Sequence, residues 1–255
     1  MRRPALVALL LLPLAGCSPS AAQPAPSSSG VTGPVTVLAA ASLTEVFTVL
    51  GKDFEAANPG TRVSFSFGAS STLAQQIVGG APADVFAAAS PATMATVTKA
   101  GLADGEPKVF ARNELVIAVP PGNPKGIGGL ADLARPGTKV VLCAAEVPCG
   151  AVARKALDAA KVSVTPLTLA ADVKAALSTV ELGEADAALV YRTDARSAGG
   201  KVAAVDFAES AQAINDYPIV ALAHAPNPKG AAAFVSFVRS APAGRALTQV
   251  GFQVP

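Results

Sequence analysis

The fold is decided by residues 35–44, which read V-T-V-L-A-A-A-S-L-T. Apolar residues run without alternation as far as Ser42, which is typical of a buried strand in a parallel sheet. Apolar residues then recur at helical spacing up to an Asn-Pro-Gly at 58–60, and Ser42 with Glu45 forms an S-x-x-E pattern that predicts a capping box. The sequence therefore predicts a strand that leads directly into a helix whose first turn presents a hydroxyl and free N–H groups.

A junction of this kind favours an anionic ligand, because ligands bind beyond the carboxyl ends of strands and a helix N-terminus attracts negative charge. Three later places repeat the layout: Ser70 opens a helix after a strand, Cys149 precedes another helix, and Asp172-Val173 begins a third. Several such helix starts can replace the water shell of a dianion. The same residue types are also ordinary helix caps, so the pattern alone leaves a purely structural role open.

The composition limits the classes of protein. The chain has 255 residues, of which 51% are hydrophobic and 5% aromatic, enough for a full core in one large domain or two lobes. Its formal net charge is +2, and Arg2 and Arg3 lie in a segment that we expect to be removed, which leaves the rest formally neutral. The charge gives no support to nucleic-acid binding.

The first seventeen residues have the layout of an export signal. Arg2 and Arg3 precede a short apolar run at 5–14, and Leu-Ala-Gly precedes Cys17. This resembles a bacterial lipobox, which implies a signal peptide over residues 1–16 and a lipid on the Cys17 thiol. Residues 17–33, rich in Ser, Pro and Ala, would be a flexible tether. We expect a lipoprotein on the extracytoplasmic face of the cell membrane; an ordinary signal with an incidental cysteine is the alternative.

Strands and helices alternate along the remaining chain, which predicts an α/β fold with mainly parallel sheets. Besides the opening unit, a turn and strand are expected at 81–86, and strands at 63–67, 115–119, 139–143, 164–169, 186–191, 202–207 and 218–223. Helices are expected from Ser70 to the glycines at 79–80, and at 91–99, 126–133, 151–161, 172–182, 230–240 and 243–250.

Six motifs occur in a fixed order: A-A-A-S-L-T at 39–44, G-A-S-S-T-L-A at 68–74, G-A-P-A-D-V-F at 80–86, E-V-P-C-G at 146–150, D-V-K-A-A-L at 172–177 and A-L-V-Y-R-T-D-A at 188–195. Over residues 35–252 this set resembles the molybdate-binding proteins of bacterial ABC transporters (ModA), in the periplasmic binding protein superfamily. The resemblance implies a two-lobed, type II Venus-flytrap fold in which each lobe is a mixed, mostly parallel sheet flanked by helices. It implies one lobe from 34–112 plus 218–255, a second from 113–217, and hinges near 113–119 and 216–222.

The resemblance also implies the function: a monomer that captures molybdate, and also tungstate, between its lobes and delivers it to a membrane permease. The implied ligands are the hydroxyls of Ser42, Ser70 and Tyr191 and the backbone N–H groups of Cys149 and Val173. The metal would be held through its oxygens, without direct protein ligands, and no cofactor or catalytic residue is implied. From the residues alone, the favoured interpretation of Tyr191 is a packed side chain whose hydroxyl is satisfied.

The cysteines raise a separate expectation. If Cys17 carries lipid, Cys143 and Cys149 remain, and an even remainder in an exported protein predicts a disulfide between them. Two reduced, buried cysteines are the alternative, and a metal site is disfavoured because only these and one histidine remain. Cys149 departs from the family pattern, where a small residue such as Ala is expected, but a main-chain contact does not depend on the side chain.

Other functions stay open at this stage. A receptor for sulfate or phosphate would use the same kind of cavity, and a phosphate site would need an acceptor such as Asp172. An enzyme with Ser42 or Ser70 as nucleophile would need a base, and the one histidine, His224, follows a strand near the expected hinge. No G-x-S-x-G motif is present, and an inert surface adhesin would not explain the ordered helix starts.

Overall fold

The computed structural model describes residues 30–255, and residues 31–255 form one compact unit. The expected signal peptide at 1–16, the lipidated Cys17 and all but the end of the tether at 17–33 lie outside the described residues. Across the described part of the chain, no helix is both long and apolar enough to cross a membrane.

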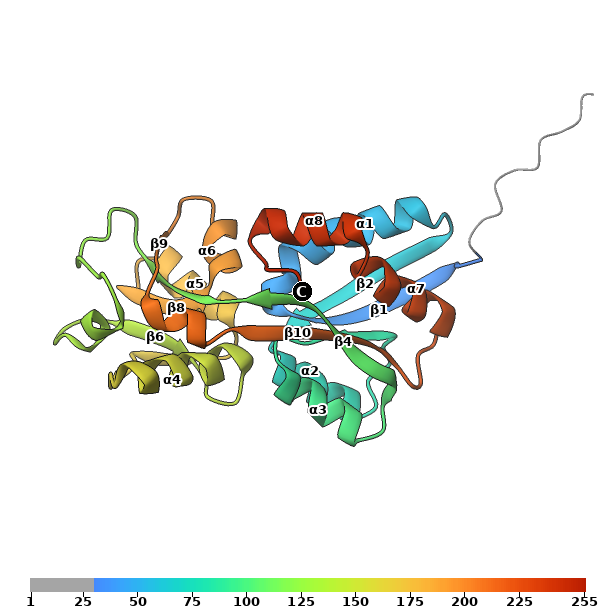
Figure 1. The fold of residues 1–255 in the computed structure, drawn as a ribbon, viewed down its shortest axis with the longest axis horizontal. Helices are drawn as coiled ribbons and strands as arrows, with labels where there is room; N and C mark the ends of the chain where they lie inside the picture. The colour runs from blue at the N-terminus through green and yellow to red at the C-terminus, as the bar shows by residue number, and fades with distance from the viewer. Residues whose placement is uncertain (1–29) are drawn as a thin grey trace, which may run out of the picture. The chain divides into compact units, whose positions relative to one another are not determined.

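The first sheet has the strand order β2-β1-β3-β10-β4. Its strands are β1 (Gly33–Ala40), β2 (Thr61–Gly68), β3 (Val85–Ala87), β4 (Ala103–Asn113) and β10 (Asn215–Leu222). Helices α1 (Thr44–Ala57), α7 (Pro228–Val238) and α8 (Ala241–Val250) cover one face, and α2 (Ser70–Val78) and α3 (Pro91–Lys99) cover the other (Figure 1). We call this sheet with its helices the first lobe.

The second sheet has the order β7-β6-β8-β5-β9. Its strands are β5 (Leu115–Val119), β6 (Val140–Cys143), β7 (Thr168–Ala170), β8 (Ala187–Tyr191) and β9 (Ala203–Val205). Helices α4 (Pro148–Ala160), α5 (Val173–Glu181) and α6 (Arg192–Ser197) flank it, with short 3-10 turns η2 (Leu130–Ala134) and η3 (Ala208–Gln212). We call this sheet with its helices the second lobe (Figure 1).

These two mixed sheets confirm the predicted two-lobed fold class, but not the predominance of parallel pairing. In the first sheet β2 and β3 run parallel to β1, as β7 and β8 do to β6 in the second. However, β10 runs antiparallel to β3 and β4, and β5 antiparallel to β8 and β9. The antiparallel strands belong to the segments that carry the chain between the sheets, and a chain that leaves a sheet and returns must run in both directions.

One strand and one α-helix were not predicted, and another helix was overestimated in length. Strand β4 is an edge strand with several charged residues and Pro107, so its sequence lacks the apolar alternation by which strands are found. Helix α6 is six residues long and mostly polar. The helix expected at 126–133 is only the turn η2, because Gly126, Gly128 and Gly129 disfavour helix ahead of it.

The cores of the two lobes differ in composition. The first-lobe core under α1, α7 and α8 holds a cluster of phenylalanine rings around Phe47 and Phe234, whose centroids lie 6.1 Å apart. The second-lobe core is built mainly from Ala, Val and Leu, and it also includes Ala41 and Ala69, which follow β1 and β2 of the first lobe. The two lobes therefore share apolar contacts at the strand ends.

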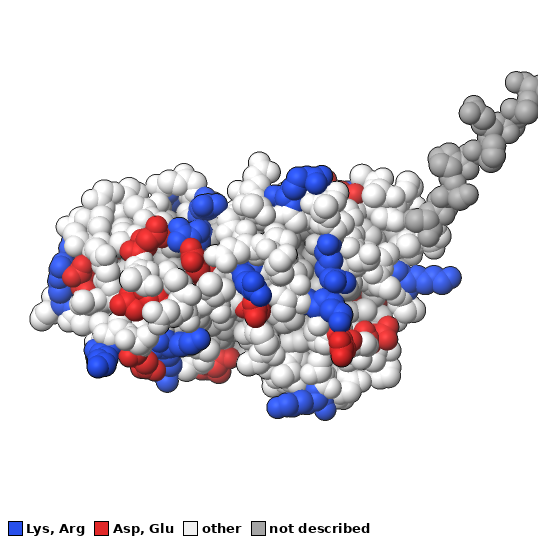
Figure 2. Space-filling view, viewed as in Figure 1, with Lys and Arg blue, Asp and Glu red and all other residues white. Residues whose placement is uncertain are grey.

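On the face in Figure 2, acidic and basic side chains are interspersed, without a large patch of one sign.

Candidate functional site

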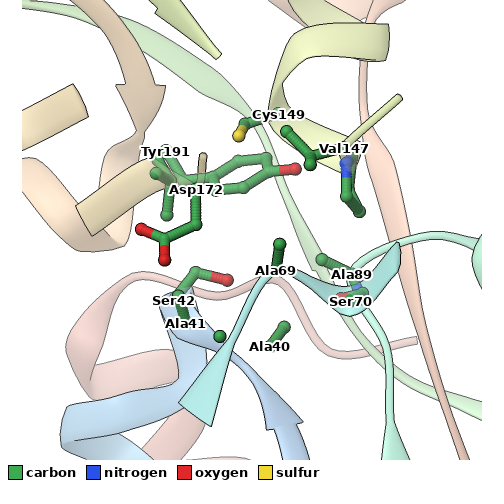
Figure 3. A pocket seen from close by; sticks show the side chains of 13 residues that line it. Ala40, Ala41, Ser42, Ala69, Ser70, Ala89, Val147, Cys149, Asp172 and Tyr191 are labelled. Carbon is green, nitrogen blue, oxygen red and sulfur yellow. The ribbon is translucent and has the colours of Figure 1, made fainter. Parts of the chain in front are cut away.

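A cavity lies where β1 and β2 end and where α4 and α5 begin. The first lobe lines it with Ser42 and Ser70, and the second lobe with Cys149 and Tyr191 (Figure 3). Val173 of the second lobe also lines it. The remaining lining residues are Ala40, Ala41, Gly68, Ala69, Ala89, Val147, Pro148 and Asp172. The structure thus brings all five residues of the implied ligand set to one cavity, although they span 150 positions of the sequence.

Ser42 reaches the cavity in a different way from the one predicted. A 3-10 turn, η1 (Ala41–Leu43), separates β1 from α1, and α1 has no side-chain cap at its N-terminus. The predicted capping box of Ser42 and Glu45 is therefore wrong, because the turn places Ser42 before the cap position. The Ser42 hydroxyl lies instead 2.8 Å from the hydroxyl of Tyr217, and Glu45 pairs with Lys174.

Ser70 is the first residue of α2 and is 1% exposed. Its hydroxyl oxygen accepts a hydrogen bond of 3.0 Å from the backbone N–H of Ala89, just after β3. Because this bond uses a lone pair of the oxygen, the hydroxyl proton of Ser70 stays available for an acceptor in the cavity.

Cys149 lies in the first turn of α4, directly after Pro148 at the first helical position. Backbone N–H groups in a first turn have no partner within the helix, so that of Cys149 can bind a ligand. A disulfide joins Cys149 to Cys143 at the end of β6, with the two Cα atoms 5.8 Å apart. The next residue must be Gly150, because a Cβ there would lie 1.8 Å from the carbonyl oxygen of Ala144.

Val173 begins α5, and the Asp172 side chain caps this helix by accepting a hydrogen bond of 2.9 Å from the Ala175 N–H. The cap uses one carboxylate oxygen of Asp172 and leaves the N–H of Val173 without a partner inside the helix. The side chain of Val173 is buried and apolar, so only its backbone N–H can donate a hydrogen bond into the cavity.

Tyr191 ends β8 and is 1% exposed. Its hydroxyl oxygen accepts a hydrogen bond of 2.5 Å from the Nδ2 amide of Asn215. Burial raises the pKa of Tyr191 well above its usual range, so the hydroxyl keeps its proton at neutral pH and can donate it. The packed and the ligand-binding interpretations of Tyr191 are therefore compatible, since the buried ring carries its hydroxyl to the cavity (Figure 3).

Within residues 30–255, none of the side chains that line the cavity is cationic. Lys174, which follows Val173, points elsewhere: its ammonium lies 2.8 Å from Glu45 of the first lobe and 3.1 Å from Asp194 of the second. Although burial lowers the pKa of Lys174, the two carboxylates outweigh it and raise that pKa. No group of three or more potential metal-ligating side chains is found in the described part of the chain.

Sequence reasoning missed the side chains behind the cavity, chiefly Asn215 and Tyr217 on β10. Tyr217 is fully buried, and the rings of Tyr191 and Tyr217 meet edge to face with centroids 5.9 Å apart. The signal that could have found them is the run Asn-Asp-Tyr at the start of an apolar strand, which is an unusual place for an amide and a phenol. His224 lies exposed in a turn after β10, outside the cavity lining, so neither serine has a histidine base there.

This fold and this cavity define a two-lobed solute-binding protein. Residues 35–253 match the family described as bacterial extracellular solute-binding protein. The molybdate-binding protein ModA of Mycobacterium tuberculosis strain H37Rv is 44% identical over 250 residues, covering 97% of this chain and 95% of that protein. ModA of Escherichia coli K12 is 32% identical over 232 residues, covering 87% and 90%. The chain therefore belongs to the ModA family of extracellular solute-binding proteins.

Solved structures confirm the fold. The periplasmic molybdate-binding protein of Azotobacter vinelandii superimposes with a TM-score of 0.74 at 21% identity, covering 87% of this chain and 99% of that one. The sulfate-binding protein SubI of M. tuberculosis superimposes with a TM-score of 0.76 at 21% identity, covering 87% of each chain. The family consists of solute-binding proteins that act outside the cytoplasm, so this chain is an extracytoplasmic binding protein and not an enzyme.

Proposed function

We propose that this protein captures molybdate, and also tungstate, in the cavity between its lobes and delivers it to the permease of an ABC transporter. One observation carries the proposal: donors from η1, α2, α4, α5 and β8 converge on one cavity, and within the described residues its lining includes no lysine or arginine. The names of the 44% and 32% identical relatives support the choice of molybdate.

The chemistry of the cavity suits a tetrahedral dianion. Hydroxyls of Ser42, Ser70 and Tyr191 and N–H groups of Cys149 and Val173 would each donate a hydrogen bond to an oxygen of the anion. The first turns of α4 and α5 add the partial positive charge of two helix N-termini. These neutral donors would replace the water shell without a counter-charge, and the anion would then leave for the permease without breaking a salt bridge.

The same donors disfavour a protonated anion. At neutral pH phosphate retains a proton, and a fully enclosed hydrogen phosphate needs an acceptor for it. Asp172 is the one carboxylate that lines the cavity within residues 30–255, and it accepts from the N–H of Ala175. Phosphate is the less favoured alternative because its proton would depend on this single carboxylate, through the one oxygen that the Ala175 N–H leaves free. Sulfate, which is fully deprotonated, would differ from molybdate mainly in size.

Binding would be coupled to a hinge motion between the two lobes. Their expected bounds, 34–112 with 218–255 and 113–217, would shift by up to three residues, because β4 of the first lobe ends at Asn113 and β10 begins at Asn215. The chain crosses from β4 to β5 at Glu114 and returns before β10, which gives two crossing segments. The anion would contact both lobes only when they are closed, and this difference in contacts would drive closure. The ion pair between Glu45 of α1 and Lys174 of α5 joins the same two lobes beside the cavity.

The export pattern adds a membrane anchor to this proposal. Residues 1–16 would be removed as a signal peptide, Cys17 would carry lipid, and the monomer would be held at the extracytoplasmic face of the cell membrane. A test is to express the full chain and its Cys17→Ser variant in a bacterial host. Mass spectrometry of the N-terminal peptide should find an acylated Cys17, and the variant should no longer fractionate with the membrane. An unmodified cysteine would overturn the anchor without affecting anion binding.

Titration calorimetry of the chain from Ser18 onward, with molybdate, tungstate, sulfate and phosphate in parallel, tests the proposed ligand. We expect tight one-to-one binding of molybdate and tungstate and no heat with phosphate. Binding of sulfate alone would assign the protein to another transporter with the same cavity. No heat with any of the four anions would contradict the proposed function as a whole.

A further inference from the structure

Two residues of one strand lie directly behind the cavity hydroxyls. Asn215 and Tyr217 are two positions apart on β10, so their side chains share one face of the strand. From that face Asn215 contacts the hydroxyl of Tyr191 in the second lobe, and Tyr217 contacts the hydroxyl of Ser42 in the first. A single strand thus supports a hydroxyl donor of each lobe.

The amide of Asn215 fixes the role of the Tyr191 oxygen. Its Nδ2 group lies 2.5 Å from the Tyr191 hydroxyl and 3.4 Å from the carbonyl oxygen of Pro148. A carbonyl oxygen can only accept, so the amide must present its NH₂ group on this side. The NH₂ group can only donate, and Tyr191 must therefore accept. Its own proton is directed away from Asn215, toward either the cavity or the neighbouring hydroxyl of Tyr217, and an anion in the cavity would be the stronger acceptor because it is charged.

Tyr217 acts in the same way on Ser42. The two hydroxyls lie 2.8 Å apart, and either could be the donor in an empty cavity. Each hydroxyl has one proton, so Ser42 can keep this contact and also donate to an anion only when Tyr217 donates to Ser42. Tyr217 is fully buried, and burial raises its pKa well above the usual range, so it retains the proton that this arrangement requires.

We propose that Asn215 and Tyr217 are positioning residues that orient the protons of Tyr191 and Ser42 toward the anion. This inference rests on the proposed function. Ser70 follows the same rule, since its oxygen accepts from the N–H of Ala89 at 3.0 Å. Each of the three cavity hydroxyls therefore has an acceptor site engaged by the protein, which leaves its proton to the ligand and disfavours acceptance of a ligand proton.

A double-mutant cycle tests the role of Tyr217. Tyr217→Phe keeps the ring but removes the proton that Ser42 accepts, and we expect about a tenfold loss of molybdate affinity by calorimetry. In a Ser42→Ala background the same change should cost less than about twofold, because the group on which it acts is absent. The wild type should discriminate more strongly than Tyr217→Phe against hydrogen phosphate. Equal losses in both backgrounds would show a packing role and overturn the assignment.

A second cycle tests Asn215 and remains informative if Tyr217→Phe does not fold. Asn215→Asp has nearly the same shape but accepts where the amide donated, so the Tyr191 proton would turn away from the cavity. We expect about a hundredfold loss of affinity, most of which should disappear in a Tyr191→Phe background. The same loss in both backgrounds would mean that the added charge acts alone, and it would overturn the role of Asn215.

The wild type separates this inference from the function on which it rests. If the wild type binds sulfate in place of molybdate, the proposed ligand is wrong, and both cycles are measured with sulfate. If the wild type binds none of the four anions, the proposed function fails and the inference with it. If the wild type binds but the cycles show no coupling, the inference alone fails.

Discussion

The two sides of the cavity differ in the kind of donor that they would offer to an anion. The first lobe offers side-chain hydroxyls, Ser42 and Ser70, at the ends of parallel strands. The second lobe offers the N–H groups of Cys149 and Val173 in helix first turns, together with the hydroxyl of Tyr191. A hydroxyl donor is lost when the residue is changed, whereas a backbone donor is lost only when the backbone moves. The two sides should therefore respond differently to substitution.

The largest loss of affinity is expected from Gly150→Ala, which adds one methyl group to the side of the cavity that the second lobe forms. Its Cβ would lie 1.8 Å from the Ala144 carbonyl oxygen, so the first turn of α4 must shift and carry the Cys149 N–H with it. We expect at least about a hundredfold loss of molybdate affinity by calorimetry, the cost of two or more bonds to a charged ligand.

Gly244→Ala is the matched control for that substitution, because its added Cβ in α8 would lie 3.7 Å from Val254 in ordinary contact. It should leave the affinity unchanged. An equal affinity for Gly150→Ala and the wild type would show that the second side does not depend on the backbone position of α4.

Ser42→Ala should come next in size. It removes one hydrogen bond to a charged ligand, which costs about 1.5–3 kcal/mol, or about ten- to a hundredfold in affinity. Val173→Ala, on the opposite side, should change the affinity less than about threefold, because its N–H remains. Ser64→Ala controls for loss of a hydroxyl, since Ser64 contacts Thr36 outside the cavity. Similar losses for Ser42→Ala and Val173→Ala would contradict the distinction between the two sides.

Lys174→Ala tests whether charge contributes to the site or only to the fold. Lys174 lies 3.1 Å from Asp194, whose side chain is fully buried, while a quarter of the Lys174 side chain is exposed. We expect a loss of about 2 kcal/mol in the free energy of unfolding at neutral pH, less than for a fully buried pair. The affinity should change less than about fivefold, because only the partly exposed pair with Glu45 joins the lobes.

The effect of Lys174→Ala should depend on pH in a defined direction. Burial raises the pKa of Asp194 from 3.8 to about 6, with Lys174 opposing the rise. The folded state therefore holds this proton more tightly than the unfolded state, and the resulting stability is present below about pH 4 and lost as pH rises through about 6. Without Lys174 the pKa should rise further, so denaturant titrations should show a smaller difference from the wild type at acidic pH than at neutral pH. A pH-independent difference would mean that Asp194 is not the partner that matters.

Reduction of the disulfide is expected to have the smallest effect on the fold. Cys143 and Cys149 are six positions apart, so the bond closes a short loop and should contribute no more than about 2 kcal/mol to stability. Since the loop carries the Cys149 N–H, reduction should weaken molybdate binding severalfold while the fold remains. Calorimetry with and without reductant measures this, and thiol titration of the unfolded, unreduced protein should find neither cysteine reactive. Two reactive thiols, or an affinity that reduction does not change, would contradict this role.

The sequence predicts those parts of the fold and of the site that depend on interactions between residues close in the chain. The strands and helices that meet at the cavity follow from apolar spacing, and Ser42, Ser70, Cys149 and Val173 mark helix starts that can be found within a few residues. Charged β4 and polar α6 were missed because they lack that spacing.

The failures at the site itself are of longer range. The Ser42 hydroxyl contacts Tyr217, 175 positions away in the sequence. No local pattern therefore predicts this contact in place of the expected helix cap. Asn215 likewise reaches Tyr191 from a strand of the other sheet. Both contacts depend on how β10 returns between the lobes, which apolar spacing does not encode.

The most direct test of the central claim is a crystal structure of residues 31–255 with molybdate, located by the anomalous signal of the metal. We predict the metal inside the cavity, with its oxygens within hydrogen-bonding distance of Ser42, Ser70, Tyr191 and the N–H groups of Cys149 and Val173. Lys174 should keep its contacts with Glu45 and Asp194. A molybdate found elsewhere, or one bound by a lysine or arginine, would contradict the neutral donor site described here.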